Sequence, residues 1–226
     1  MPELAVMEAT LNFGWYGKVP CVGDFIRSSL SPHFVGAWDV WMQTFLVTGR
    51  EALDERWRDC YFSAPIWRFA FSAGMTGPRT AAGIVMPSID RVGRQYPLCL
   101  AVELDLPVWS AYRALEPIFA PLEDAALAML EDGASLPMLN DRLAALPPPL
   151  ATALPRSGTI GSARAIVADD SADFALASLA IQEPASIFIS SVAGSNRLLV
   201  TGQLPSGPEE ASAFFDLHSP RWGFHA

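Results

Sequence analysis

The first third of the chain carries a hydrophobic pattern with the period of an α-helix. Large apolar residues recur every three or four positions, at Phe34, Trp38, Trp41, Met42, Phe45, Leu46 and Leu53. Ser31 and Pro32 stand just before this pattern. A serine can cap the first free amides of a helix, and a proline fits its first position. The pattern therefore predicts a helix over residues 32–53, followed by a short helical piece over 54–62.

Short hydrophobic segments around this helix predict β-strands over residues 11–16, 65–71, 81–86 and 96–104. The last of them is apolar almost without interruption. Such strands are typically buried on both faces, with helices covering them. We therefore expect a sheet with helical layers above and below it.

The second half of the chain predicts further helices and strands. The helical patterns cover 110–131, 136–146, 171–182 and 208–217, and the strand patterns cover 159–168, 186–192 and 197–202. Pro117 and Pro121 lie inside the first helix, which therefore either begins near residue 117 or kinks there. Gly194, Ser195 and Asn196 stand between the last two strands and predict a hairpin turn.

These elements together predict an α/β fold, a single three-layer sandwich with a mixed central sheet flanked by helices. At 226 residues the chain has the length of one large domain or two small ones. We expect one domain over 1–226, with a motif-bearing part at 11–105 and a helical and C-terminal α/β part at 106–226. The proline-rich segment 147–158 is the best candidate for a linker.

Composition and charge exclude several classes of protein. Apolar residues make up 51% of the chain and charged residues only 17%, which is enough hydrophobic material for a core and excludes disorder. The net charge of −9 disfavours nucleic acids and anionic membrane surfaces as partners. Neither a hydrophobic run long enough to span a membrane nor a signal peptide is evident, so we expect a cytoplasmic location without direct membrane insertion.

The charge is also unevenly distributed. Residues 1–100 contain nine acidic and nine basic residues, so the acidic excess lies in residues 101–226. Lys18 is the only lysine in the chain.

The cysteines and histidines do not form a recognisable metal site. Cys21, Cys60 and Cys99 are widely spaced and include no CxxC pair, which fits free thiols in a reducing compartment. The chain has three histidines, and none is placed to pair with another as a metal ligand. We therefore expect no metal site.

The loop at residues 17–25 contains glycines and a lysine but does not fit a phosphate-binding loop. Lys18 comes at the wrong end of the loop, Pro20 lacks an amide donor, and Asp24 would repel a phosphate. The chain also has no GxGxxG motif. We therefore expect no nucleotide cofactor.

A second polar loop, at residues 86–94, concentrates Ser88, Asp90, Arg91 and Arg94. Its arginines could form a recognition surface, since guanidinium groups bind carboxylates or phosphates with paired hydrogen bonds. They could equally hold the loop together by pairing with Asp90, Asp24 or Asp39. The two roles are compatible, because a rigid polar loop is also a good docking surface.

A catalytic set is hard to find. The chain has no GxSxG motif, and its carboxylates are scattered. We expect no catalytic residues. A small hydrolase using Asp24, Asp90 or Cys21 is the alternative, and convergence of these residues in a deep pocket would favour it.

Five of the seven tryptophans lie in the first 70 residues: Trp15, Trp38, Trp41, Trp57 and Trp67. They either fill the core or anchor a contact surface, where tryptophan and arginine are enriched.

Two blocks of residues follow one another in a distinctive order in the first half of the chain. The first block runs Gly14-Trp15-Tyr16-Gly17-Lys18-Val19-Pro20, then Gly23-Asp24-Phe25, then Phe34 and Trp38-Asp39-Val40-Trp41. The second runs Ala64-Pro65-Ile66-Trp67-Arg68-Phe69, then Gly83, then Met86-Pro87-Ser88-Ile89-Asp90-Arg91-Val92-Gly93-Arg94 and Tyr96-Pro97-Leu98. In this order the two blocks resemble the TagF family of type VI secretion-associated proteins.

The resemblance implies a non-catalytic cytoplasmic regulator that represses type VI secretion after the apparatus components have been made. The implied partner is a forkhead-associated-domain scaffold protein of that system. Candidate partner-binding or motif residues are Lys18, Gly23, Asp24, Phe25, Arg27, Asp39, Trp41, Ser88, Asp90, Arg91, Gly93 and Arg94. We also expect the loops 17–25 and 87–94 to lie close together, since their charges are complementary.

Overall fold

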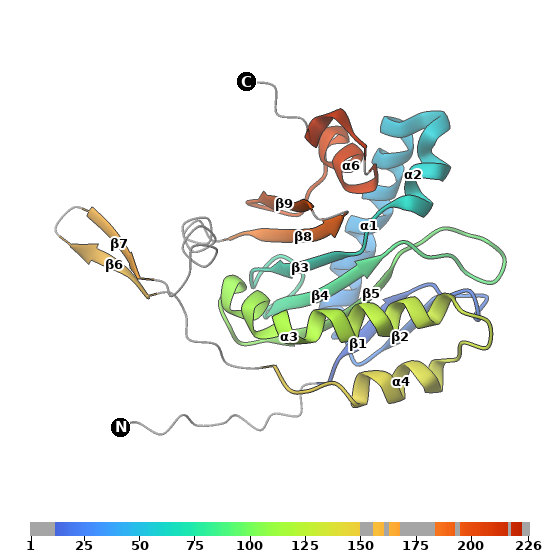
Figure 1. Cartoon of the computed structure of the whole chain (residues 1–226), viewed down its shortest axis with the longest axis horizontal. Coiled ribbons are helices and arrows are strands. Elements are labelled where there is room, and N and C mark those ends of the chain that lie inside the picture. Colours follow the sequence, from blue (N-terminus) through green and yellow to red (C-terminus); the bar gives the residue numbers. More distant parts are fainter. Residues whose placement is uncertain are drawn as a thin grey trace.

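A seven-stranded sheet forms the centre of the computed structural model, which describes residues 12–149, 156–160, 163–167, 184–192, 195–216 and 218–222 (Figure 1). The strands lie in the order β2-β1-β5-β4-β3-β8-β9. Their bounds are β1 Gly14–Gly17, β2 Ile26–Ser28, β3 Trp67–Phe71, β4 Thr80–Met86, β5 Leu98–Leu104, β8 Ser186–Val192 and β9 Ser195–Thr201.

Every neighbouring pair in this sheet is antiparallel. The expectation of a mixed sheet is therefore wrong. Strands β3, β4 and β5 are joined by short connections, and such connections favour antiparallel pairing because a parallel pair needs a long crossover.

Helices cover both faces of the sheet, as expected for a layered α/β fold (Figure 1). One face packs against α3 (Val108–Leu127) and α4 (Leu136–Ala144). The other packs against α1 (Pro32–Leu53), α2 (Trp57–Ser63) and α6 (Pro208–Phe215). The described residues also form three short 3-10 helices, at Asp54–Arg56, Ala128–Leu130 and Pro220–Trp222.

The start of α1 confirms the serine-proline signal. The Ser31 hydroxyl accepts a hydrogen bond from the Phe34 amide at 3.1 Å. The amide and hydroxyl of Ser31 both donate to the carboxylate of Glu103, each at 2.8 Å. Because Glu103 lies on β5, this contact ties the first turn of the helix to the central sheet.

Aromatic side chains fill the layer between α1 and the sheet. Trp38 is completely buried, and its ring lies 5.4 Å from that of Phe69 on β3. Phe188 on β8 and Phe214 on α6 lie 5.3 Å apart in the same cluster. The five early tryptophans are all buried to more than nine-tenths, so the core interpretation is correct for each of them.

The opposite layer mixes aliphatic residues with aromatic ones such as Trp109 and Phe119, and a polar clamp ties it to the sheet. The guanidinium of Arg68 on β3 donates two hydrogen bonds to the Glu123 carboxylate on α3, at 2.6 and 3.0 Å. The hydrogen bond to Glu123 raises the pKa of Arg68, although burial acts against it. This pair fixes α3 against the sheet.

Several predicted boundaries shift. Helix α3 begins at Val108, so the alternative start near residue 117 is wrong and both prolines lie inside the helix. The single strand expected over 159–168 is a hairpin of β6 (Arg156–Ile160) and β7 (Ala163–Val167), and β6 takes up the end of the expected linker at 147–158. The expected helix at 171–182 lies outside the described residues. Strand β2 was not predicted.

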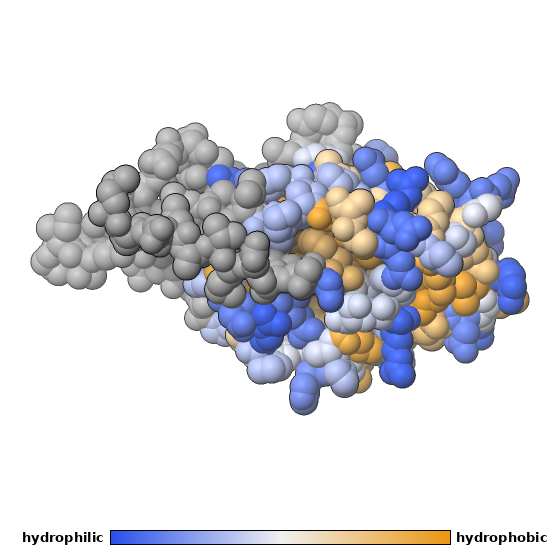
Figure 2. Space-filling view, turned by 90° about the horizontal axis from the view of Figure 1, so that it is seen from below, coloured by the Kyte–Doolittle hydropathy of each residue, from blue (hydrophilic) through white to orange (hydrophobic). Residues whose placement is uncertain are grey.

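Seen from below, hydrophobic residues on the coloured surface lie in patches interrupted by hydrophilic ones (Figure 2). Among the described residues, no helix has both the length and the hydrophobicity needed to cross a membrane.

Candidate functional site

The two motif loops lie against each other at one end of the sheet. Because β1 is antiparallel to β5, the loop that leaves β1 meets the loop that enters β5. The Arg91 amide donates to the Val22 carbonyl at 2.9 Å, and the Arg94 guanidinium donates to the Gly23 carbonyl at 2.7 Å. The expected proximity of the loops is therefore confirmed.

Asp90 is the centre of this arrangement and is buried. Its carboxylate accepts from the Arg94 amide at 2.9 Å, the Arg94 Nε at 2.6 Å and the Val92 amide at 3.1 Å. The Nζ of Lys18 lies 3.0 Å from its Oδ2. Burial alone would raise the pKa of Asp90, but the hydrogen bonds from Arg94, Lys18 and Val92 outweigh it and hold this pKa well below the usual range.

A tyrosine-rich group adjoins the loops on the α1 side. The hydroxyls of Tyr16 and Tyr96 both donate to Oδ1 of Asp39, at 2.8 and 3.0 Å, and Gln43 donates to its other oxygen at 2.7 Å. Burial and the Asp39 carboxylate raise the pKa of both tyrosines, so their hydroxyls stay protonated. Phe25 stacks on Tyr16 with ring centroids 5.6 Å apart.

The backbone of Ser88 anchors the 87–94 loop through hydrogen bonds to Tyr61. The buried Tyr61 hydroxyl donates to the Ser88 carbonyl at 2.7 Å and accepts from the Ser88 amide at 3.1 Å. Burial raises the pKa of Tyr61, so this hydroxyl keeps the proton it donates. The contact joins the 87–94 loop to α2.

The structure divides the remaining candidates between surface and core. Asp24, Phe25, Arg27, Arg91 and Gly93 are exposed. Trp41 lies apart from them, buried in the aromatic core, where its Nε1 donates to the Pro205 carbonyl at 2.7 Å. It packs the fold and does not belong to the loop surface.

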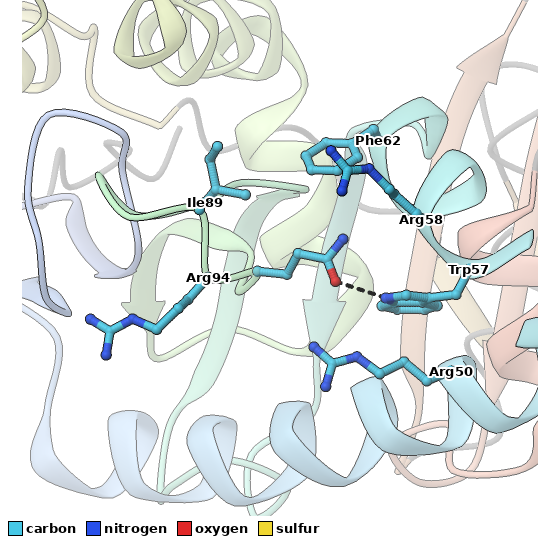
Figure 3. Close-up of a pocket in the computed structure, with 8 residues that line it drawn as sticks. Arg50, Trp57, Arg58, Phe62, Ile89 and Arg94 are labelled. Atoms are coloured by element: carbon cyan, nitrogen blue, oxygen red, sulfur yellow. Dashed lines mark hydrogen bonds between the residues drawn. The ribbon is translucent and has the colours of Figure 1, made fainter. Parts of the chain in front are cut away.

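A recess of about 520 Å³ lies beside the 87–94 loop. We call it the arginine recess; it is lined by Arg50, Trp57, Arg58, Phe62, Ile89, Gly93, Arg94 and Gln95 (Figure 3). Trp57 Nε1 donates to the Gln95 Oε1 at 2.7 Å and joins α2 to the loop. Sequence reasoning missed Arg50, Arg58, Phe62 and Gln95. Their positions carry no motif, and only the fold brings them together.

The three residues of the hydrolase alternative, Asp24, Asp90 and Cys21, differ in their exposure to solvent. Asp90 is saturated by hydrogen bonds and closed to solvent, so its oxygens are not open to a substrate. Asp24 is exposed, and one oxygen accepts from the Phe25 amide at 2.8 Å. Cys21 is partly buried. Within the described ranges, no group of three or more His, Cys, Asp or Glu side chains could hold a metal ion.

The fold and the paired loops define a layered α/β protein built around a seven-stranded antiparallel sheet. Residues 14–146 match the family model described as the TagF N-terminal domain, type VI secretion system-associated. The chain therefore belongs to the TagF family. Among solved structures it is similar to PA0076 from Pseudomonas aeruginosa PAO1, with 30% sequence identity, a TM-score of 0.70, and coverage of 90% of this chain and 94% of that one. No curated protein matches it.

Proposed function

We propose that this protein is a non-catalytic cytoplasmic regulator that represses type VI secretion after translation by binding a component of the apparatus. A forkhead-associated-domain scaffold protein of that system is the proposed partner. Membership of the TagF family supports the assignment to type VI secretion.

The burial of Asp90 is the observation that carries the regulatory role. A catalytic carboxylate must reach its substrate, whereas Asp90 is enclosed by Lys18, Arg94 and the loop backbone. Its contacts make the two loops rigid, and a rigid loop pair loses little conformational entropy on binding a partner.

The exposed part of the same loops provides a contact surface. Phe25 is 41% exposed and Val92 is 70% exposed, and the exposed Arg91 lies near Gly23 between the loops. Aromatic and arginine side chains are the types most often found at the centre of protein interfaces. We propose that Phe25, Arg91 and Val92 contact the scaffold protein.

Deletion of the gene tests the role in repression. In a strain whose apparatus is normally quiet, we expect deletion to start export of the secreted tube protein. In a strain that exports this protein, we expect overexpression to abolish the export. Returning the intact gene to the deletion strain should stop export of the tube protein again, which controls for effects on neighbouring genes. Unchanged export in the deletion strain would contradict the proposal.

The partner is tested by capture with the tagged full chain from lysate of a type VI-positive strain, followed by mass spectrometry. We expect the forkhead-associated-domain scaffold among the captured proteins. Capture of other apparatus components without the scaffold would contradict this choice of partner but leave the regulatory role standing.

A further inference from the structure

The arginine recess contains two cations whose charge no ion pair among the described residues neutralises. Arg50 on α1 and Arg58 on α2 form no ion pair with any described residue, and both are exposed. The neighbouring Arg56, by contrast, donates to Asp216 at 2.8 Å. None of the described residues that line the recess is acidic.

An unneutralised pair of arginines is notable in a chain with a net charge of −9. Four acidic residues lie close to these arginines along the chain, but none of them forms an ion pair with either arginine and none lines the recess; they are Glu51, Asp54, Glu55 and Asp59. Guanidinium groups form their strongest hydrogen bonds with anions. The recess therefore has the charge of an anion-binding site.

Aromatic rings hold these two arginines at the wall of the recess. The Arg50 guanidinium lies 5.6 Å from the Trp57 ring centroid, and that of Arg58 lies 5.7 Å from the Phe62 ring centroid. Phe62 is 51% exposed, so it offers apolar area to a ligand. The site thus combines charge with an apolar wall, which fits a polypeptide better than a small inorganic ion.

The opposite wall of the recess is rigid. Gln95 is held by Trp57, and Arg94 is held by both Asp90 and the Gly23 carbonyl. In Figure 3 the guanidinium groups of Arg50 and Arg58 lie on opposite sides of the hydrogen bond from Trp57. Two separated cations match two carboxylates along a chain, whereas one phosphate would need them to converge.

We propose that the arginine recess binds an acidic segment of the partner protein. Carboxylates of this segment pair with Arg50 and Arg58, and an apolar side chain between them packs on Trp57 and Phe62. The identity of the partner rests on the proposed function, but the recognition of an acidic peptide can be measured without it.

Fluorescence anisotropy with the purified full chain tests the recess directly. The probe is a labelled peptide of alternating glutamate and leucine, with a glutamine-leucine peptide as its uncharged counterpart. We expect saturable binding of the acidic peptide only, weakened by added salt. Arg50→Glu and Arg58→Glu should each weaken binding by about tenfold, the loss of one charge-assisted pair.

Arg142→Glu is the matched control, because Arg142 is exposed on α4 at the other face of the sheet. It should bind the peptide as the unaltered chain does. Melting curves of all three variants should agree with that of the unaltered chain, which shows that lost binding is not lost folding. Equal binding by Arg142→Glu and both recess variants would overturn the proposal, and so would binding of a phosphothreonine peptide in preference to the glutamate peptide.

A complementation assay separates this proposal from the proposed function. If the intact gene silences secretion in the deletion strain and the Arg50→Glu/Arg58→Glu gene does not, the regulatory role and the recess proposal are both supported. If both genes silence it equally, the recess is not the site of partner recognition. If the intact gene itself has no effect, the regulatory role fails, and the anisotropy result still decides the chemistry of the recess.

Discussion

The Nζ of Lys18 lies 3.0 Å from Oδ2 of Asp90, and both side chains are almost completely buried. This ion pair joins the β1–β2 loop to the β4–β5 loop and uses the only lysine of the chain. A buried charge is strongly destabilising without a partner. Each of these residues therefore depends on the other, and the pair explains why both loops carry polar motifs.

Asp90→Asn should lower the melting temperature at neutral pH, because it leaves the buried Lys18 without its counter-charge. The folded pKa of Asp90 is depressed, so its stabilisation is complete above the usual carboxyl pKa of about 4 and fades as the pH falls below it. Melting curves from neutral pH to about pH 3 should thus show the difference from the unaltered chain shrinking with acid.

Asp105→Asn is the control for this experiment, because Asp105 is exposed and pairs with the exposed Arg79. It should change the melting temperature little at any pH. A difference between Asp90→Asn and the unaltered chain that stayed constant through acid would contradict the role given to Asp90.

Arg91→Ala and Arg94→Ala should have different effects. Arg94 donates to Asp90 and to the Gly23 carbonyl, so its removal should lower the melting temperature. The side chain of Arg91 is exposed, and its removal should change the free energy of unfolding by no more than about 0.5 kcal/mol. If Arg91 contacts the partner, affinity for the scaffold should fall by about thirtyfold.

The measurement is thermal melting alongside titration of the scaffold protein with each variant. A large loss of stability in Arg91→Ala would assign this residue to the fold and not to the contact surface. If Arg91→Ala changed neither the affinity for the scaffold nor the stability, Arg91 would have no role in the contact surface or in the fold.

Two glycine substitutions should act in opposite directions. Gly36 lies within α1 with no atom within 4 Å of an added Cβ, so Gly36→Ala should stabilise the fold by about 0.5–1 kcal/mol. Gly93→Ala should destabilise the fold. Gly93 has space around it, but its φ is +86°, which a residue with a side chain adopts at a cost of about 1–2 kcal/mol. Chemical denaturation of both variants measures the difference, and equal effects of the two would contradict the conformational argument.

A fragment ending at residue 150 should fail to fold cooperatively. In the whole chain β8 pairs with β3 through four residue pairs, and Phe214 of α6 stacks on Trp67 at 5.1 Å. Without them, β3 becomes an open edge and Trp67 loses the aromatic ring that covers it. Size-exclusion chromatography and denaturation of the fragment test this; cooperative unfolding with the stability of the whole chain would make the single-domain prediction wrong.

The sequence by itself determined most elements of the first half, although not β2. The pattern from Phe34 to Leu53 placed α1 with both ends correct, because helix periodicity and capping depend only on residues a few positions apart. The apolar runs likewise placed β3, β4 and β5 within two residues. Residues such as Lys18 and Asp90 stood out by their type, and the complementary charges of the two loops predicted that the loops meet.

Only the tertiary structure decided what those elements do together. Sequence periodicity does not specify strand order, so the insertion of β8 beside β3 and the fully antiparallel sheet could not be read from it. The arginine recess is a further case. Arg50 and Arg58 are eight positions apart, but the chain turns at Asp54, where φ is +45°, and they come from different helices. Which side chains share a surface depends on such turns and on long-range packing, neither of which a local pattern encodes.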